Sequence, residues 1–206
     1  REYDDILYVV TNATPQYWIM EEGEDVELRP QLFDSKDEAL THVPVNKIRI
    51  FPGSNEANYT IISAIDLNEY ETADMKVETY LGAGSGIYMS TEAIYMTAPV
   101  YIPIATSTNA MMDSSMLAMD SNTALYKFTV EGTNIDMTAR TTIEGSVLNQ
   151  FSMDEYNGYF RVATTSGVTR GADADSTSAI TIFDSSMNQV GKVSDLAKGE
   201  RIYSAR

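Results

Sequence analysis

The sequence predicts an all-β protein built from repeated four-stranded sheets, and three observations support this expectation. Short runs rich in Val, Ile, Tyr, Thr and Phe recur along the chain and are separated by Gly, Asn, Asp and Ser, which is the pattern of strands joined by turns. Sustained 3.6-residue periodicity, the mark of helices, is rare. Three strand types also recur in the same order, which is typical of a repeat architecture.

The recurring unit has four strands, which we name a, b, c and d in chain order. The b strands are apolar and aromatic and end in Thr, at residues 7–11, 94–97 and 159–164. The c strands carry alternating apolar residues, at 60–66, 124–129 and 178–184. The d strands alternate with period two, at 75–81, 135–141 and 190–196. A short a run leads from each d strand to the next b strand, at 86–90, 147–151 and 201–204.

Four-stranded antiparallel sheets arranged radially make a β-propeller, so about three propeller blades are expected. Strands b to d of the first blade occupy about 3–82, with a long loop at 12–58. The second blade occupies about 86–142 and the third about 147–196, and the first strand of a next blade lies at about 200–205. Tyr8, Tyr95 and Phe160 are expected at equivalent positions. A β-sandwich also gives short strands with regular turns and is the alternative.

Two local signals refine this outline. Asn157-Gly158 lies between an a run and a b strand, and Asn-Gly is a strong signal for a tight hairpin turn. The segment Ser35 to His42 is the one helix candidate, because Ser35 and Glu38 have the spacing of a capping box.

Composition excludes several classes of function. The chain has 206 residues with 14 Lys+Arg against 30 Asp+Glu, a formal charge of −16 that repels phosphate backbones and anionic lipids. We therefore expect no nucleic-acid partner. The most apolar stretch, 93–105, contains Pro99 and Pro103 and is too short for a spanning helix, so no membrane insertion is expected. With no Cys and one His, His42, thiol chemistry is excluded and histidine-based catalysis has little material.

The chain resembles a known family in five segments, 5–12, 58–67, 81–90, 147–165 and 199–204, of which 147–165 is the most specific. These residues are similar to secreted bacterial and archaeal proteins with a C-terminal β-propeller distantly related to WD40 repeats. The resemblance implies an extracellular or cell-envelope propeller of uncharacterised function. It supplies no catalytic or cofactor-binding residues.

The candidate binding residues come from topology. In a four-stranded meander the b-to-c loops and the d-to-a connections emerge on the same face. The b-to-c loops at 12–58, 99–122 and 165–177 carry many carboxylates, so one acidic, loop-rich face is expected. A solvated acidic surface is the favoured interpretation, with no cofactor. The alternative is a Ca²⁺ site, for which the metal candidates are Asp113, Asp120, Asp173 and Asp175. The segment 82–86, rich in Gly, is interpreted as an inter-blade turn because no helix follows it.

We expect a binding or interaction module that presents this loop face to a protein or a small extracellular ligand. The alternative is the propeller portion of a hydrolase or other enzyme whose catalytic residues lie elsewhere. Closed propellers have about four to eight blades. Three blades therefore predict that the rest of a larger propeller, or a second copy, closes the ring. The N-terminus is expected to enter directly at a b strand.

Overall fold

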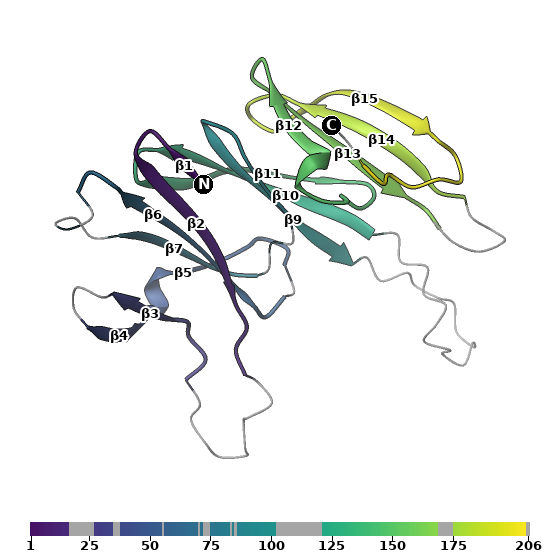
Figure 1. The fold of residues 1–206 in the computed structure, drawn as a ribbon. Coiled ribbons are helices and arrows are strands. Elements are labelled where there is room, and N and C mark those ends of the chain that lie inside the picture. The colour runs from purple at the N-terminus through teal and green to yellow at the C-terminus, as the bar shows by residue number, and fades with distance from the viewer. Residues whose placement is uncertain are drawn as a thin grey trace, which may run out of the picture. The chain divides into compact units, whose positions relative to one another are not determined.

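The computed structural model describes residues 1–16, 27–34, 38–54, 56–69, 71, 75–82, 84, 86–101, 121–168 and 175–204. These residues form short strands and two 3-10 turns, which confirms the all-β class (Figure 1). The chain divides into two compact units. The first contains Arg1–Gly84 with Val130–Ile135, and the second contains Ser85–Thr129 with Asp136–Arg206. No helix in the described part of the chain has the length and apolar character needed to cross a membrane.

The first unit is built on a five-stranded sheet with strand order β1-β2-β6-β7-β5. The strands are β1 (Glu2–Tyr3), β2 (Ile6–Ala13), β6 (Tyr59–Asp66), β7 (Lys76–Leu81) and β5 (Ile48–Ile50), and β5 alone pairs in parallel, with β7. Strand β1 corrects the expectation that the chain enters at a b strand. It pairs with β2 across a turn at Asp4 and Asp5, whose φ angles of 51° and 58° give the twist that favours tight hairpins.

The long connection between β2 and β6 has its own structure. Strands β3 (Gln31–Asp34) and β4 (Ala39–His42) form an antiparallel hairpin, followed by the 3-10 turn η2 (Val45–Lys47) and by β5. The predicted helix over Ser35 to His42 is therefore wrong for residues 39–42. The capping-box spacing is a local signal, whereas these residues are extended because they pair with β3.

The second unit contains two four-stranded antiparallel sheets (Figure 1). The second sheet is formed by β8 (Gly86–Met89), β9 (Ala93–Tyr101), β10 (Ser121–Glu131) and β11 (Asn134–Ile143). The third is formed by β12 (Met153–Tyr156), β13 (Tyr159–Ser166), β14 (Thr177–Phe183) and β15 (Gln189–Leu196). Strand β12 lies after the a run predicted at 147–151, because the turn η3 (Gln150–Ser152), capped by the Asn149 side chain, interrupts that run. Asn157 and Gly158 form the predicted hairpin turn, joining Tyr156 to Tyr159.

Each sheet is a meander of b, c and d strands that follow one another in the chain: β2-β6-β7, β9-β10-β11 and β13-β14-β15. In a β-sandwich, Greek-key connections move the chain between two sheets. Here the chain finishes the strands of one sheet before it begins the next, apart from the β3–β4 hairpin. This order is that of propeller blades.

The pairing register corrects one predicted equivalence. Leu7, Ile94 and Phe160 occupy the same place, because they pair with Ile65, Phe128 and Phe183 on the three c strands. Tyr8 and Tyr95 follow Leu7 and Ile94, so their counterpart in the third sheet is Arg161. Phe160 lies in the predicted strand but is one residue out of step. Successive residues of a strand point to opposite faces of the sheet, so Phe160 lies on the face opposite to the one that Tyr8 and Tyr95 occupy in their own sheets.

This offset allows the second and third sheets to pack together. The Tyr95 ring stacks on the Phe160 ring, with centroids 4.0 Å apart and planes 7° from parallel. Lys127 Nζ lies 5.7 Å from the centre of the Tyr95 ring and donates to the Ser185 carbonyl at 2.9 Å. Burial, followed by the negative charge of Glu155, raises the pKa of Tyr95, which keeps its phenol protonated as a donor to Glu155. The buried cluster around this stack contains Ala93, Tyr95, Leu125, Ile143, Met153, Phe160, Val162, Phe183 and Met187.

One hydrogen bond recurs in all three sheets at the start of the c strand. Thr60 Oγ1 donates to the Gly82 carbonyl at 2.9 Å, Thr123 Oγ1 donates to the Gly145 carbonyl at 2.7 Å, and Ser176 Oγ donates to the Glu200 carbonyl at 3.0 Å. We call this contact the c-strand clamp. A glycine with positive φ lies at or beside each acceptor, namely Gly82, Gly145 and Gly199. At Gly145 a Cβ atom would lie 2.6 Å from the Thr165 carbonyl oxygen, so a larger residue does not fit.

Residues 200–204 follow the last clamp without forming a strand. The Ile202 N–H donates to Thr165 Oγ1 at 3.1 Å, which holds the segment near the end of β13. A strand at 200–205 needs a further sheet to pair with, and it stays a prediction.

The repeat offers a matched stability test. Leu125 and Ile180 lie three residues before Phe128 and Phe183, so they are counterparts, but Leu125 is fully buried whereas Ile180 is 41% exposed. We expect Leu125→Ala to lower the free energy of unfolding by about 2–5 kcal/mol. Ile180→Ala is expected to change it by less than about 1 kcal/mol. Urea denaturation measures both values, and equal losses would contradict the packing described for the second unit.

A second test addresses the clamp. Thr123→Val keeps the shape of the side chain but leaves the buried Gly145 carbonyl without its donor, which costs about 1–3 kcal/mol. Thr123→Ser keeps the hydroxyl and is the matched control, with a smaller expected loss. Thermal unfolding of both variants measures the difference. A Val variant as stable as the Ser variant would show that the clamp contributes nothing.

Candidate functional site

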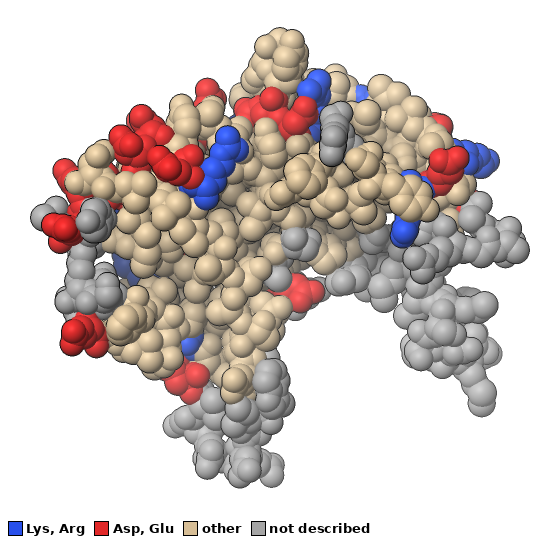
Figure 2. All heavy atoms as spheres, viewed as in Figure 1, with Lys and Arg blue, Asp and Glu red and all other residues tan. Residues whose placement is uncertain are grey.

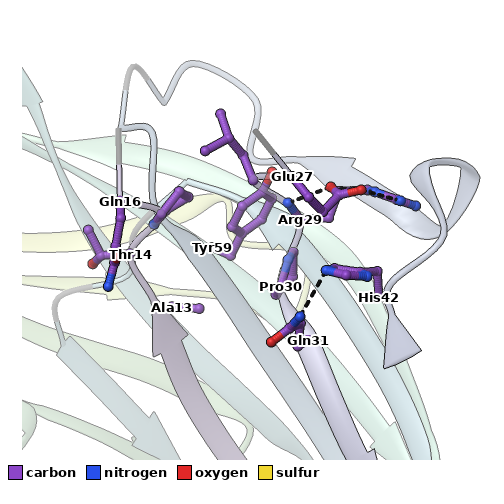
Figure 3. A pocket seen from close by; sticks show the side chains of 11 residues that line it. Ala13, Thr14, Gln16, Glu27, Arg29, Pro30, Gln31, His42 and Tyr59 are labelled. Carbon is purple, nitrogen blue, oxygen red and sulfur yellow. Dashed lines mark hydrogen bonds and ion pairs between the residues drawn. The ribbon is translucent and has the colours of Figure 1, made fainter. Parts of the chain in front are cut away.

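A pocket of about 310 Å³ opens in the first unit, where the chain leaves β2 (Figure 3). Ala13, Thr14 and Gln16 form one side of it, and Glu27 to Gln31 with His42 form the other, with the Tyr59 ring between them (Figure 3). Pro15 completes the lining. We call this cavity the Gln31–His42 pocket. It joins the end of a b strand, the start of a c strand and the β3–β4 hairpin.

Backbone pairing fixes the walls of the pocket. Ala13 pairs with Tyr59 across β2 and β6, and Gln31 pairs with His42 across β3 and β4. The Val43 N–H donates to the Pro30 carbonyl at 3.0 Å, and Val43, Pro30 and Tyr59 are buried. The pocket is therefore part of the β scaffold, and its lining needs little ordering when a ligand binds.

A carboxylate and a guanidinium are locked together at one rim. Arg29 donates to Glu27 Oε1 through Nε at 2.8 Å and to Oε2 through Nη2 at 2.5 Å, and its backbone N–H also donates to Oε1, at 3.0 Å. Arg29 Nη1 donates to the Val43 carbonyl at 3.3 Å. These hydrogen bonds from Arg29 lower the pKa of Glu27 to about 2. Glu27 is thus ionised and bound to its partner throughout the physiological range.

Gln31 and His42 supply polar groups on the hairpin side of the pocket, where Gln31 is exposed and His42 is half-buried. Gln31 Nε2 and His42 Nε2 lie 3.0 Å apart. An amide group carries both a donor and an acceptor and an imidazole nitrogen can play either role, so this contact is a hydrogen bond in either tautomer of the ring. His42 Nε2 is thereby joined to an amide and not to a Ser or Thr hydroxyl. Both side chains keep further polar atoms beyond this contact.

The predicted metal candidates are mostly outside the described residues. Asp113, Asp120 and Asp173 lie there, as does most of the acidic content of the three b-to-c loops. Asp175 is described, and its Oδ1 accepts from the Val168 N–H at 2.9 Å, which closes the base of its loop. Among the residues of known placement, no group of three His, Cys, Asp or Glu side chains is arranged to hold a metal ion.

Acidic side chains of known placement gather at the opposite end of the strands of the first sheet, over the β1–β2 and β6–β7 turns (Figure 2). The two turns are joined there, because the Leu67 N–H donates to the Asp5 carbonyl at 2.8 Å and Asn68 Nδ2 donates to Asp5 Oδ2 at 3.3 Å. The residues are Glu2, Asp4, Asp5, Asp66, Glu69 and Glu71. This end of the sheet carries the a-to-b and c-to-d turns. The sequence argument addressed the opposite end, where the b-to-c loops lie, and therefore did not identify this acidic group.

A larger cavity, about 440 Å³, lies in the second unit between the start of β8 and residues 147–151. Its lining combines Ile87, Val147, Leu148 and Phe151 with the polar residues Thr97, Asn149 and Gln150 and carries no charged side chain. Thr97 Oγ1 donates to the Gly86 carbonyl at 3.4 Å, and Asn149 Oδ1 accepts from the Phe151 N–H at 2.9 Å. These side-chain atoms thus bind the cavity's own backbone, whereas in the Gln31–His42 pocket the Gln31 and His42 side chains bond each other.

The sequence argument missed the pocket residues Arg29, Gln31 and Tyr59. It took residues 12–58 as one loop and singled out His42 only as the chain's one imidazole. Strands of four residues give too short an alternation to be recognised, and the Gln31 to His42 contact depends on pairing across a turn. The signal that was available is Glu27 two residues before Arg29, a spacing that lets a carboxylate bind both a backbone N–H and a guanidinium.

The chain matches the β-propeller domain family over residues 1–206. It belongs to that family. It is 56% identical over 64 residues to an uncharacterised protein of Methanocaldococcus jannaschii, covering 31% of this chain and 10% of that protein. It is 36% identical over 84 residues to an uncharacterised protein of Archaeoglobus fulgidus, covering 41% of this chain and 12% of that protein. The matches thus span about a tenth of each relative's length.

The Glu27–Arg29 pair can be tested by titration. We expect the Glu27 carboxyl to titrate near pH 2, because Arg29 stabilises its ionised form, and the pair to persist until the pH falls through that value. In an Arg29→Gln variant the Glu27 pKa should return toward the ordinary value of 4.5. Side-chain carboxyl NMR shifts measure both, and an unchanged pKa in the variant would refute the pairing.

Proposed function

We propose that this β-propeller domain is the binding module of an extracellular or cell-envelope protein and that it holds a small ligand in the Gln31–His42 pocket. The observation that carries the proposal is the pocket itself, in which converging polar side chains stand on paired strands. Sites grafted on rigid β scaffolds commonly lie where loops leave the sheet, as this one does. The resemblance of several segments to secreted proteins supports the location.

Further propeller blades are the other partner that we propose. The outward face of the third sheet carries Ile180 at 41% and Val193 at 54% exposure, and these two residues pair with each other. The corresponding face of the second sheet is covered by the third. A further sheet, from a longer polypeptide or a second copy, would cover the exposed face in the same way.

The binding proposal is tested by a thermal-shift panel on the full 206-residue chain, with small polar metabolites, sugars, short peptides and millimolar Ca²⁺ as separate arms. A ligand present at 100 times its Kd stabilises the folded state by about 2.7 kcal/mol. We expect at least one organic ligand to raise the melting temperature of the native chain and to lose this effect in Gln31→Ala and His42→Ala variants.

Gln189→Ala is the matched control, because Gln189 is an exposed amide on β15, outside the pocket. It should keep the full response. A stabilising ligand whose effect is unchanged in both pocket variants would place binding elsewhere. The calcium arm tests the loop-face expectation separately, and no shift with Ca²⁺ would remove it.

A further inference from the structure

The balance of charge in the Gln31–His42 pocket selects against ionic ligands. Glu27 and Arg29 are joined by the hydrogen bonds described above, and Arg29 is held further by the Val43 carbonyl. An anion that competes for Arg29, or a cation that competes for Glu27, would have to break this pair. The other polar side chains of the lining are an amide, an imidazole or a hydroxyl, and none is a carboxylate, an ammonium or a guanidinium: Thr14, Gln16, Gln31, His42 and Tyr59.

The polar atoms left to a ligand are a mixture of donors and acceptors. Gln31 and His42 each use one atom in their mutual hydrogen bond, which leaves further polar atoms of the Gln31 amide and the Nδ1 of His42 for a ligand. Gln16 adds an amide and Thr14 a hydroxyl to the opposite side (Figure 3). A ligand hydroxyl both donates and accepts, so several hydroxyls on one ligand can satisfy such a mixed set. Phosphates and carboxylates offer acceptors only and match it poorly.

The rest of the lining is apolar and partly flat. Pro15, Pro30 and the Tyr59 ring lie between the two polar sides, with Ala13 and Leu28 beside them. Tyr59 is 9% exposed and Pro30 is buried, so packing holds both in place, whereas Ala13, Pro15 and Leu28 are half-buried and offer more apolar surface. The C–H face of a pyranose ring packs on surfaces of this kind while its hydroxyls project outward. The volume of about 310 Å³ is at the lower end for ligand pockets, which suits one or two sugar rings.

We propose that the Gln31–His42 pocket binds a neutral carbohydrate, with the Gln31 amide and His42 Nδ1 bonded to ring hydroxyls and the sugar's apolar face against the half-buried Pro15 and Leu28. The inference rests on the proposed binding function and names its ligand class. Glu27 and Arg29 act as a positioning pair that keeps the hairpin side of the pocket in place and neutral.

The test is isothermal titration and saturation-transfer NMR on the full chain with matched sugars. Glucose, galactose, mannose and N-acetylglucosamine with their disaccharides are the neutral probes, and glucuronate and glucosamine are the charged ones. We expect at least one neutral sugar to bind, and the charged analogue of that sugar to bind at least tenfold more weakly. Gln31→Ala and His42→Ala should each weaken binding of the neutral sugar at least tenfold, with Gln189→Ala unchanged.

The outcomes separate the two proposals. If a charged metabolite or a peptide binds and loses affinity in the Gln31→Ala variant while no neutral sugar binds, the carbohydrate inference fails and the binding function stands. If a sugar binds equally well to both pocket variants, the assignment of the site fails. If no probe of any class binds to a chain that unfolds cooperatively, both proposals fail. Retained cooperative unfolding in each variant shows that a loss of binding is not a loss of fold.

Discussion

The packing of the second unit centres on the stacking of Tyr95 against Phe160, because its two sheets bury their facing apolar sides against each other. Aromatic pairs in this arrangement contribute about 0.5–1.5 kcal/mol beyond the area that they bury. Tyr95 comes from the second sheet and Phe160 from the third, and the buried cluster extends around them to Leu125 and Phe183. Strand β9 is accordingly buried at every position from Ala93 to Ala98, whereas β2 and β13 alternate between buried and more exposed residues.

The same scaffold explains why the candidate site lies in the first unit. There the connection from b to c strand holds the β3–β4 hairpin, and buried Val43 and Pro30 anchor it. Exposed side chains on this hairpin, such as Gln31, are positioned by strand pairing and by one another. In the binding function that we propose, selectivity would come from the Glu27–Arg29 ion pair at the rim and from the amide, imidazole and hydroxyl groups of the lining.

Sequence reasoning identified the sheets because their signal is local. Alternating apolar residues and the Asn157-Gly158 turn each act within a few positions, so they are visible in one chain. Strand β1 has two residues, too few to show alternation, and the Ser35 to Glu38 spacing favoured a helix that strand pairing overrides. The pocket joins residues from 13 to 59, and the contact between Gln31 and His42 forms only when β3 and β4 pair. No local sequence pattern predicts that contact.

The c-strand clamp has a consequence for how this protein can change. In each sheet the clamp fixes the point at which the chain returns from the b-to-c connection, at Thr60, Thr123 or Ser176. The return point is therefore set by the connection that follows the d strand, and the length of the preceding loop does not affect it. Closing a longer loop costs little entropy, since the cost grows only with the logarithm of length. We therefore expect these three connections to accept inserted segments without a shift of the clamp, provided that β5 is kept in the first of them.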